Sequence, residues 1–215
     1  MSGSISVDHR ARRPVMGLIA LGTVLWALWT GEGEAFLWGG LLALLVLVLW
    51  REPSRAVPAQ AGAVLSPADG RIVRIERAHD PYANRAALRI SVDMNLFDTH
   101  ANRASVDGVI RQVQYHPGLP VSTDLVDDAP SQERNAIVID ACGQTVTLVQ
   151  RAGLIARRIL CHVQPGDILT RGQRFGLIRF GSRIDVYLPP HAVPHVAPGE
   201  RVSATTTILA TLASA

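Results

Sequence analysis

The sequence predicts a mainly β domain, a sandwich or partly closed barrel, preceded by an N-terminal hydrophobic helical hairpin. After residue 63, many short segments alternate apolar with polar residues or form short apolar runs, which is typical of strands. Turn-forming stretches such as ADG and QPGD separate these segments. The longest apolar runs, in contrast, lie before residue 51. The expected strands are RIVRIER (71–77), AALRISVD (86–93), GVIRQVQYH (108–116), NAIVIDA (135–141), QTVTLVQ (144–150), GLIRF (176–180) and IDVYL (184–188).

The N-terminal part contains two apolar runs, 14–30 and 35–50, on either side of an acidic GEGE turn. A helix of about 16 residues is about 24 Å long, a little short of a hydrocarbon core of about 30 Å. Arginines outside both runs, among them Arg13 and Arg51, predict that both ends face the cytoplasm. We therefore expect attachment to the cell membrane, with the following domain on the cytoplasmic side. The hairpin either spans the bilayer or lies in one leaflet.

The expected domain organisation is a membrane-attachment segment over residues 1–52 and a β-rich domain over residues 53–215. A Pro- and Ala-rich stretch begins the second part and is interpreted as a linker. Within the β-rich domain, the segment 163–178 has the paired glycine turns of a lipoyl-like hammerhead sheet, and 65–75 is its candidate partner half. We expect a short helix or turn over 93–103.

Composition excludes several kinds of chemistry. All 21 basic residues of the Lys+Arg count are arginine, so no lysine is present to form a Schiff base with a substrate or to carry pyridoxal phosphate, biotin or lipoate. The two cysteines, Cys142 and Cys161, form no CxxC pair, so we expect buried free thiols and no metal site. The formal net charge of only +3, without an arginine stripe, gives no support to nucleic-acid binding.

A Gly-Ser pair, Gly181-Ser182, lies inside a stretch, 179–190, that otherwise looks like a β-strand. The stretch RFGSRID (179–185) lacks the G-x-S-x-G elbow of serine hydrolases. A strained Gly-Ser bond has a different chemistry, because the serine hydroxyl can attack the preceding carbonyl and glycine leaves that approach open. β-Elimination and hydrolysis then leave a pyruvoyl group at a new N-terminus. Such a carbonyl forms a Schiff base with an amine and accepts electrons, as pyridoxal phosphate does.

Six motifs, one of which contains Ser182, resemble the short prokaryotic form of phosphatidylserine decarboxylase. The resemblance covers the whole chain, including the apolar pair and the LWREPSR junction that follows it. The motifs are SPADG (66–70), MNLFDTHANRASVDG (94–108), YHPG (115–118), ERNAIVI (133–139), QRAGLIARRI (150–159) and GDILTRGQRFGLIRFGSRIDVYLP (166–189).

The resemblance implies a pyruvoyl-dependent lyase that decarboxylates phosphatidylserine to phosphatidylethanolamine and CO2 in phospholipid biosynthesis. It also implies a proenzyme that cleaves itself between Gly181 and Ser182. The products are a β chain of residues 1–181 and an α chain of residues 182–215, which remain together as a heterodimer. Ser182 becomes the covalent pyruvoyl cofactor and forms the Schiff base with the substrate.

The family also uses an Asp-His-Ser arrangement for self-processing. Asp69 matches the aspartate of its SPxDG motif. Of two histidines in larger relatives, the first aligns with His100 and the second with Arg103, and arginine is not a general base near neutral pH. His100 is therefore the candidate base and proton donor, with His116 as a second choice. The candidates for binding the anionic head group are Arg103, His116, Arg134, Arg157 and Arg158.

Two other classes of protein share part of this sequence pattern. A non-enzymatic, membrane-anchored envelope adaptor with a lipoyl-like domain fits the glycine turns but has no use for self-cleavage. A membrane-anchored zinc endopeptidase needs a His-x-His pair, whereas His191 and His195 are four residues apart in a Pro-rich loop. The Gly-Ser pair and its flanking motifs favour the decarboxylase.

Overall fold

The computed structural model describes residues 22, 40–41, 55–95, 98, 101–118, 132–153, 159–178 and 182–213. The chain divides into two compact units, Met1–Ser54 and Arg55–Ala215, and nearly all described residues belong to the second. The expected helical hairpin falls outside the described residues except for residues 22, 40 and 41, which are helical. Within the described part of the chain, no helix combines the length and the apolar character that crossing a membrane requires.

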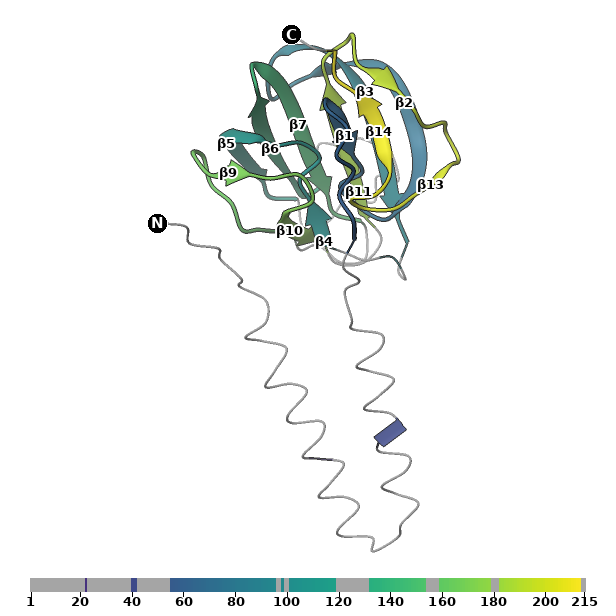
Figure 1. Cartoon of the computed structure of the whole chain (residues 1–215). Helices are drawn as coiled ribbons and strands as arrows, with labels where there is room; N and C mark the ends of the chain where they lie inside the picture. The colour runs from purple at the N-terminus through teal and green to yellow at the C-terminus, as the bar shows by residue number, and fades with distance from the viewer. Residues whose placement is uncertain are drawn as a thin grey trace, which may run out of the picture. The chain divides into compact units, whose positions relative to one another are not determined.

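The second unit is built from strands, as the sequence predicts, and they form one large curled sheet and two small sheets (Figure 1). The large sheet has the order β13-β2-β3-β11-β7-β6-β5-β9, and the small sheets have the orders β1-β14-β12 and β4-β10-β8. Every pairing is antiparallel. The strands are β1 (Ala63–Leu65), β2 (Gly70–Asp80), β3 (Arg85–Met94), β4 (Ala101–Arg103), β5 (Gly108–His116), β6 (Arg134–Ala141), β7 (Gln144–Arg151), β8 (Ile159–Cys161), β9 (Ile168–Leu169), β10 (Arg174–Ile178), β11 (Ser182–Leu188), β12 (Val193–Pro194), β13 (Arg201–Val202) and β14 (Ile208–Thr211).

The main core lies on the inner, concave face of the large sheet. Alternation along β11 explains this, because Ile184, Val186 and Leu188 belong to the main apolar cluster. Tyr187, between them, belongs to a second and smaller cluster on the outer face with Ala136 and Val149. The large sheet is therefore covered in part on both faces, which is why β6 and β7 are buried along almost their whole length.

The chain passes from a small sheet to the large one between β10 and β11. Strand β10 lies between β4 and β8, with Ile178 opposite Ile159, and β11 then starts at Ser182 between β3 and β7. Ser182 thus begins a strand where the chain enters the large sheet, rather than lying inside a strand that runs through residues 179–190.

The structure agrees with the predicted fold class and differs from the sequence predictions at two places. The mainly β class is confirmed, whereas the lipoyl-like hammerhead remains a prediction. Residues 101–103 form β4 rather than part of a helix, because they pair with β10. The expectation that Cys142 is buried is wrong: this thiol is exposed, in the tight β6–β7 turn, where its φ is 51°. Cys161 is half-buried.

Candidate functional site

Ser182 lies at one end of the large sheet, as the first residue of β11. Its partner across the ladder is Met94, the last residue of β3, whose side chain is buried. Gly70, the first residue of β2, lies on the other side of β3, so its backbone is about 10 Å from that of Ser182 at ordinary strand spacing. A Cβ on Gly70 would lie 2.1 Å from the carbonyl oxygen of Asp93, so only glycine fits there. Three strand ends thus meet beside the Gly-Ser pair.

Asp69 lies at the same end of the sheet, immediately before β2. The Asp69 side chain is 13% exposed, and its Oδ1 accepts a hydrogen bond of 2.8 Å from the backbone N–H of Ala204. Arg55 binds both carboxylate oxygens, with 2.7 Å from Nη2 to Oδ2, and also donates to the carbonyl of Ala204. The carboxylate is therefore held in one orientation by charge-assisted hydrogen bonds.

Arg103 ends β4 close to the SPADG segment. Its backbone N–H donates to the carbonyl of Pro67 over 2.8 Å, and its Nη1 donates to the carbonyl of Gly172 over 2.8 Å. This places the arginine near the loop that carries Asp69. His100, the candidate base, falls outside the described residues, but it directly precedes β4 and is three residues from Arg103.

A chain of buried side-chain amides lies behind this end of the sheet. Asn135 donates to Gln150 over 3.0 Å, and Gln150 donates to Asn102 over 2.7 Å. Asn102 donates to the sulfur of Met94 over 3.8 Å, and Met94 is the residue paired with Ser182. All three amides are at most 1% exposed. Sequence reasoning missed them, although polar residues at core positions of predicted strands were a usable signal.

Two ion pairs on the outer face flank the strand that carries Ser182. Arg183 donates from Nε to Asp93 on β3 over 2.6 Å, and Arg151 on β7 donates from Nε to Asp185 over 2.6 Å. Arg151 is 8% exposed and Asp185 is 1% exposed. Sequence reasoning also missed these residues, because the partners of an ion pair across a sheet follow from register rather than from sequence spacing.

His116 is placed differently from the other candidates. It ends β5, opposite Arg134, which is in turn opposite Arg151, so three strand spacings separate β5 from β11. Its ring is 6.1 Å from that of Tyr82, between centroids. Burial raises the pKa of the Tyr82 phenol above its ordinary 10.0, against the opposing effect of the nearby Arg134. Arg157 and Arg158 fall outside the described residues.

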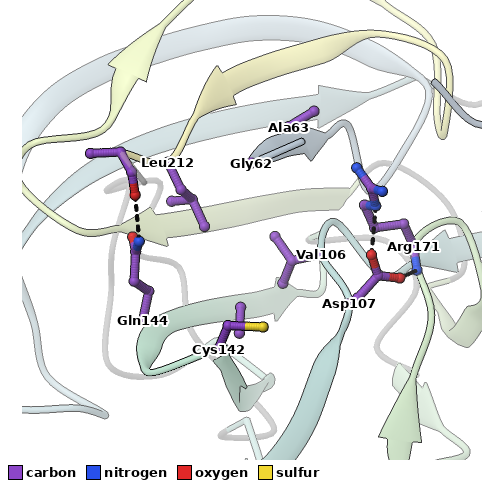
Figure 2. A pocket seen from close by; sticks show the side chains of 10 residues that line it. Gly62, Ala63, Val106, Asp107, Cys142, Gln144, Arg171 and Leu212 are labelled. Carbon is purple, nitrogen blue, oxygen red and sulfur yellow. Dashed lines mark hydrogen bonds and ion pairs between the residues drawn. The ribbon is translucent and has the colours of Figure 1, made fainter. Parts of the chain in front are cut away.

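A pocket of about 250 Å³ lies beside the β6–β7 turn (Figure 2). Ala141, Cys142 and Gln144 of the β6–β7 turn line it, together with Leu212 and the ion pair between Asp107 and Arg171. Strand β7 has 8 residues between this turn and the Ser182 end, or about 23 Å of strand. Among the residues that the structure describes, no cluster of three potential metal ligands occurs.

Comparison with known proteins gives consistent matches. The family described as phosphatidylserine decarboxylase matches residues 42–210. A phosphatidylserine decarboxylase proenzyme of Ralstonia pickettii is 57% identical over 201 residues, which cover 93% of each chain. A protein of the same name from Paraburkholderia xenovorans is 54% identical over 200 residues, 93% of this chain and 94% of its own. One from Cupriavidus pinatubonensis is 55% identical over 196 residues, 89% of this chain and 90% of its own.

Proposed function

The chain belongs to the phosphatidylserine decarboxylase family, and we propose that Gly181–Ser182 is the bond at which this proenzyme cleaves itself. The enzyme decarboxylates phosphatidylserine to phosphatidylethanolamine and CO2, and it does so, in this proposal, with a pyruvoyl group derived from Ser182. The β chain of residues 1–181 and the α chain of residues 182–215 remain together as a heterodimer. The envelope-adaptor alternative finds no support among the relatives.

The observation that carries this proposal is the place of Ser182 at the passage from β10 to β11. Cleavage at this bond leaves in place the ladder pairings of β10 and those of β11 from Arg183 onward. The new N-terminus is then still held, because β11 pairs with β3 from Ser182 onward and with β7 from Arg183 onward. Ser182 therefore fits a prosthetic group formed from the chain itself, in a sequence that contains no lysine.

Self-cleavage begins when the Ser182 hydroxyl attacks the Gly181 carbonyl carbon and the acyl group moves from nitrogen to oxygen. β-Elimination from this ester releases Gly181 as the C-terminal carboxylate of the β chain and leaves a dehydroalanine. Water then displaces ammonia from the dehydroalanine and gives the pyruvoyl group. A base must accept the Ser182 proton in the first step and the Cα proton in the second.

Three residues of this chain have proposed roles around Ser182. Asp69, fixed by Arg55 and the Ala204 N–H, acts in self-processing. His100 accepts the processing proton and later donates a proton to the substrate α-carbon. Arg103 binds the anionic head group, because a guanidinium suits a phosphate or carboxylate. A pyruvoyl carbonyl would supply the electron sink for the bonding electrons that stay behind when CO2 leaves.

The remaining candidates have subsidiary places in this proposal. His116 stays a second candidate for contact with the head group, on the outer face of the sheet. The membrane-attachment segment, residues 1–52, holds the β-rich domain at the cytoplasmic side of the cell membrane, where a phospholipid substrate is available. No metal or nucleic acid takes part.

The experiment that tests the proposed function labels the cofactor and measures turnover in the same preparation. Purified enzyme is treated with phenylhydrazine, which reacts with a ketone carbonyl, and decarboxylation is followed as release of CO2 from carboxyl-labelled phosphatidylserine in mixed micelles. We expect the label on the small chain, together with loss of CO2 release. Ser182→Ala is the control and should take no label and release no CO2. Turnover in an enzyme whose small chain takes no label would contradict the pyruvoyl mechanism.

A further inference from the structure

We propose that the two outer-face ion pairs, Arg183–Asp93 and Arg151–Asp185, are positioning elements for the pyruvoyl-bearing end of the α chain. We call these four residues the β11 clamp. The inference rests on the proposed cleavage at Gly181–Ser182 and deepens it, because it identifies residues that matter after the bond is cut.

The side chains of β11 alternate between the inner and the outer face of the large sheet. Ile184 and Val186 belong to the main core on the inner face, whereas Tyr187 belongs to the outer-face cluster. Because side chains alternate along a strand, Arg183 and Asp185 also lie on the outer face. They are one and three residues from Ser182, and they are on the face opposite the main core.

The two ion pairs join β11 to its two different neighbours, β3 on one side and β7 on the other. Arg183 is directly opposite Asp93 on β3 and binds it through two nitrogens, with Nε to Oδ1 at 2.6 Å and Nη2 to Oδ2 at 3.4 Å. Asp185 is opposite Val149 and binds Arg151 diagonally on β7. Strand β11 is therefore held from both neighbours within three residues of Ser182.

Self-cleavage removes the covalent link between β10 and β11. In the proenzyme, residues 179–181 join β11 covalently to β10. In the processed enzyme, Ser182 is a chain end, and chain ends fray unless they are tied down. On the β7 side the paired register begins only at Arg183, so the clamp residues lie where the new end would separate from the sheet. A displacement of about 1 Å of a reacting group lowers a rate by about 10²-fold.

The clamp should therefore affect decarboxylation more than self-cleavage. The test uses full-length enzyme with Arg183→Gln or Asp93→Asn, each of which opens the pair between β11 and β3. Asp93 is suited to substitution because its side chain is 41% exposed. The matched control is Arg111→Gln, which opens a cross-strand ion pair with Asp140 near the opposite end of the same large sheet.

We expect complete self-cleavage in all variants and full phenylhydrazine labelling of the small chain. In the two clamp variants kcat should fall about tenfold or more with KM unchanged, because the carbonyl is present but misplaced. Amide hydrogen exchange over 183–185 should be faster in these variants than in the control. The charge-exchanged double variant, Arg183→Asp with Asp93→Arg, should recover most of the lost kcat.

Two results would overturn the inference: a kcat equal to that of Arg111→Gln, or self-cleavage that is lost together with decarboxylation. The second result would mean that the pair acts in the proenzyme or in folding as a whole. A wild-type chain that remains uncut is a separate result, and it would refute the proposed function from which the clamp derives its purpose.

Discussion

Gly70→Ala tests whether the junction of β2, β3 and β11 controls self-cleavage. The added Cβ would lie 2.1 Å from the carbonyl oxygen of Asp93, and real Cβ atoms essentially never come closer than 3.0 Å to another heavy atom. One of the two strands must therefore move by at least 0.9 Å (3.0 − 2.1). Because Asp93 precedes Met94, which pairs with Ser182, this movement is transmitted to the cleavage site.

The expected effect on self-cleavage follows from that displacement. A misplacement of about 1 Å costs about 10²-fold in rate for a reaction that depends on alignment of two groups. Gly108→Ala is the matched control, since its Cβ would lie 2.3 Å from the carbonyl oxygen of Asp140 near the far end of the large sheet. Both substitutions overpack the sheet and should cost about 1–3 kcal/mol of stability.

The assay is the conversion of full-length chain into the two products during cell-free synthesis, followed by gel electrophoresis with time. Thermal unfolding of both variants shows whether their stabilities are comparable. We expect Gly70→Ala to cleave about 10²-fold more slowly than wild type and Gly108→Ala to cleave at nearly the wild-type rate. Equal cleavage rates in two variants of equal stability would show that the junction of β2, β3 and β11 does not control self-cleavage.

Three further predictions concern single side chains. Asp69→Asn should slow self-cleavage by about 10²-fold or more, as expected for loss of a carboxylate that supports acid–base catalysis by another residue, while the chain remains folded by circular dichroism. Asp185→Asn should destabilise the fold by about 3–5 kcal/mol in urea unfolding, because it removes one carboxylate charge that the buried Arg151 guanidinium binds. An unchanged unfolding midpoint would show that this pair contributes nothing. Tyr82 holds its proton more tightly in the folded state than in the unfolded state, so stability should decrease as the pH rises above 10.0 and through its raised pKa. Tyr82→Phe should remove a phenolate step above pH 10.0 from the absorbance titration and make the alkaline loss of stability smaller.

The strands were the part of the fold most open to prediction, because alternation and apolar runs follow directly from burial on one or both faces of a sheet. Strand β11 shows this well, since Ile184, Val186 and Leu188 were already expected to share one face. The sheet order was not accessible in the same way. It depends on pairings between strands far apart in the chain, such as β11 with β3, 90 residues apart at Arg183 and Asp93.

Residues of the candidate site could be predicted only where they belong to a short local sequence motif. Ser182 and Asp69 were found because each lies in a short recognisable stretch, and the structure places both at one end of the large sheet. The residues that support them were missed because they are brought together only by register. Asn102, Gln150 and the β11 clamp belong to this group. The exposure of Cys142 was missed for a related reason, since the tight β6–β7 turn overrides the usual burial of cysteine.

The most direct test of the central claim is intact-protein mass spectrometry of the purified wild-type protein beside Ser182→Ala. We expect two wild-type chains, residues 1–181 and 182–215, with the smaller one beginning in a pyruvoyl group. The variant should give a single uncut chain. A folded wild-type protein found only as one chain of 215 residues would contradict it.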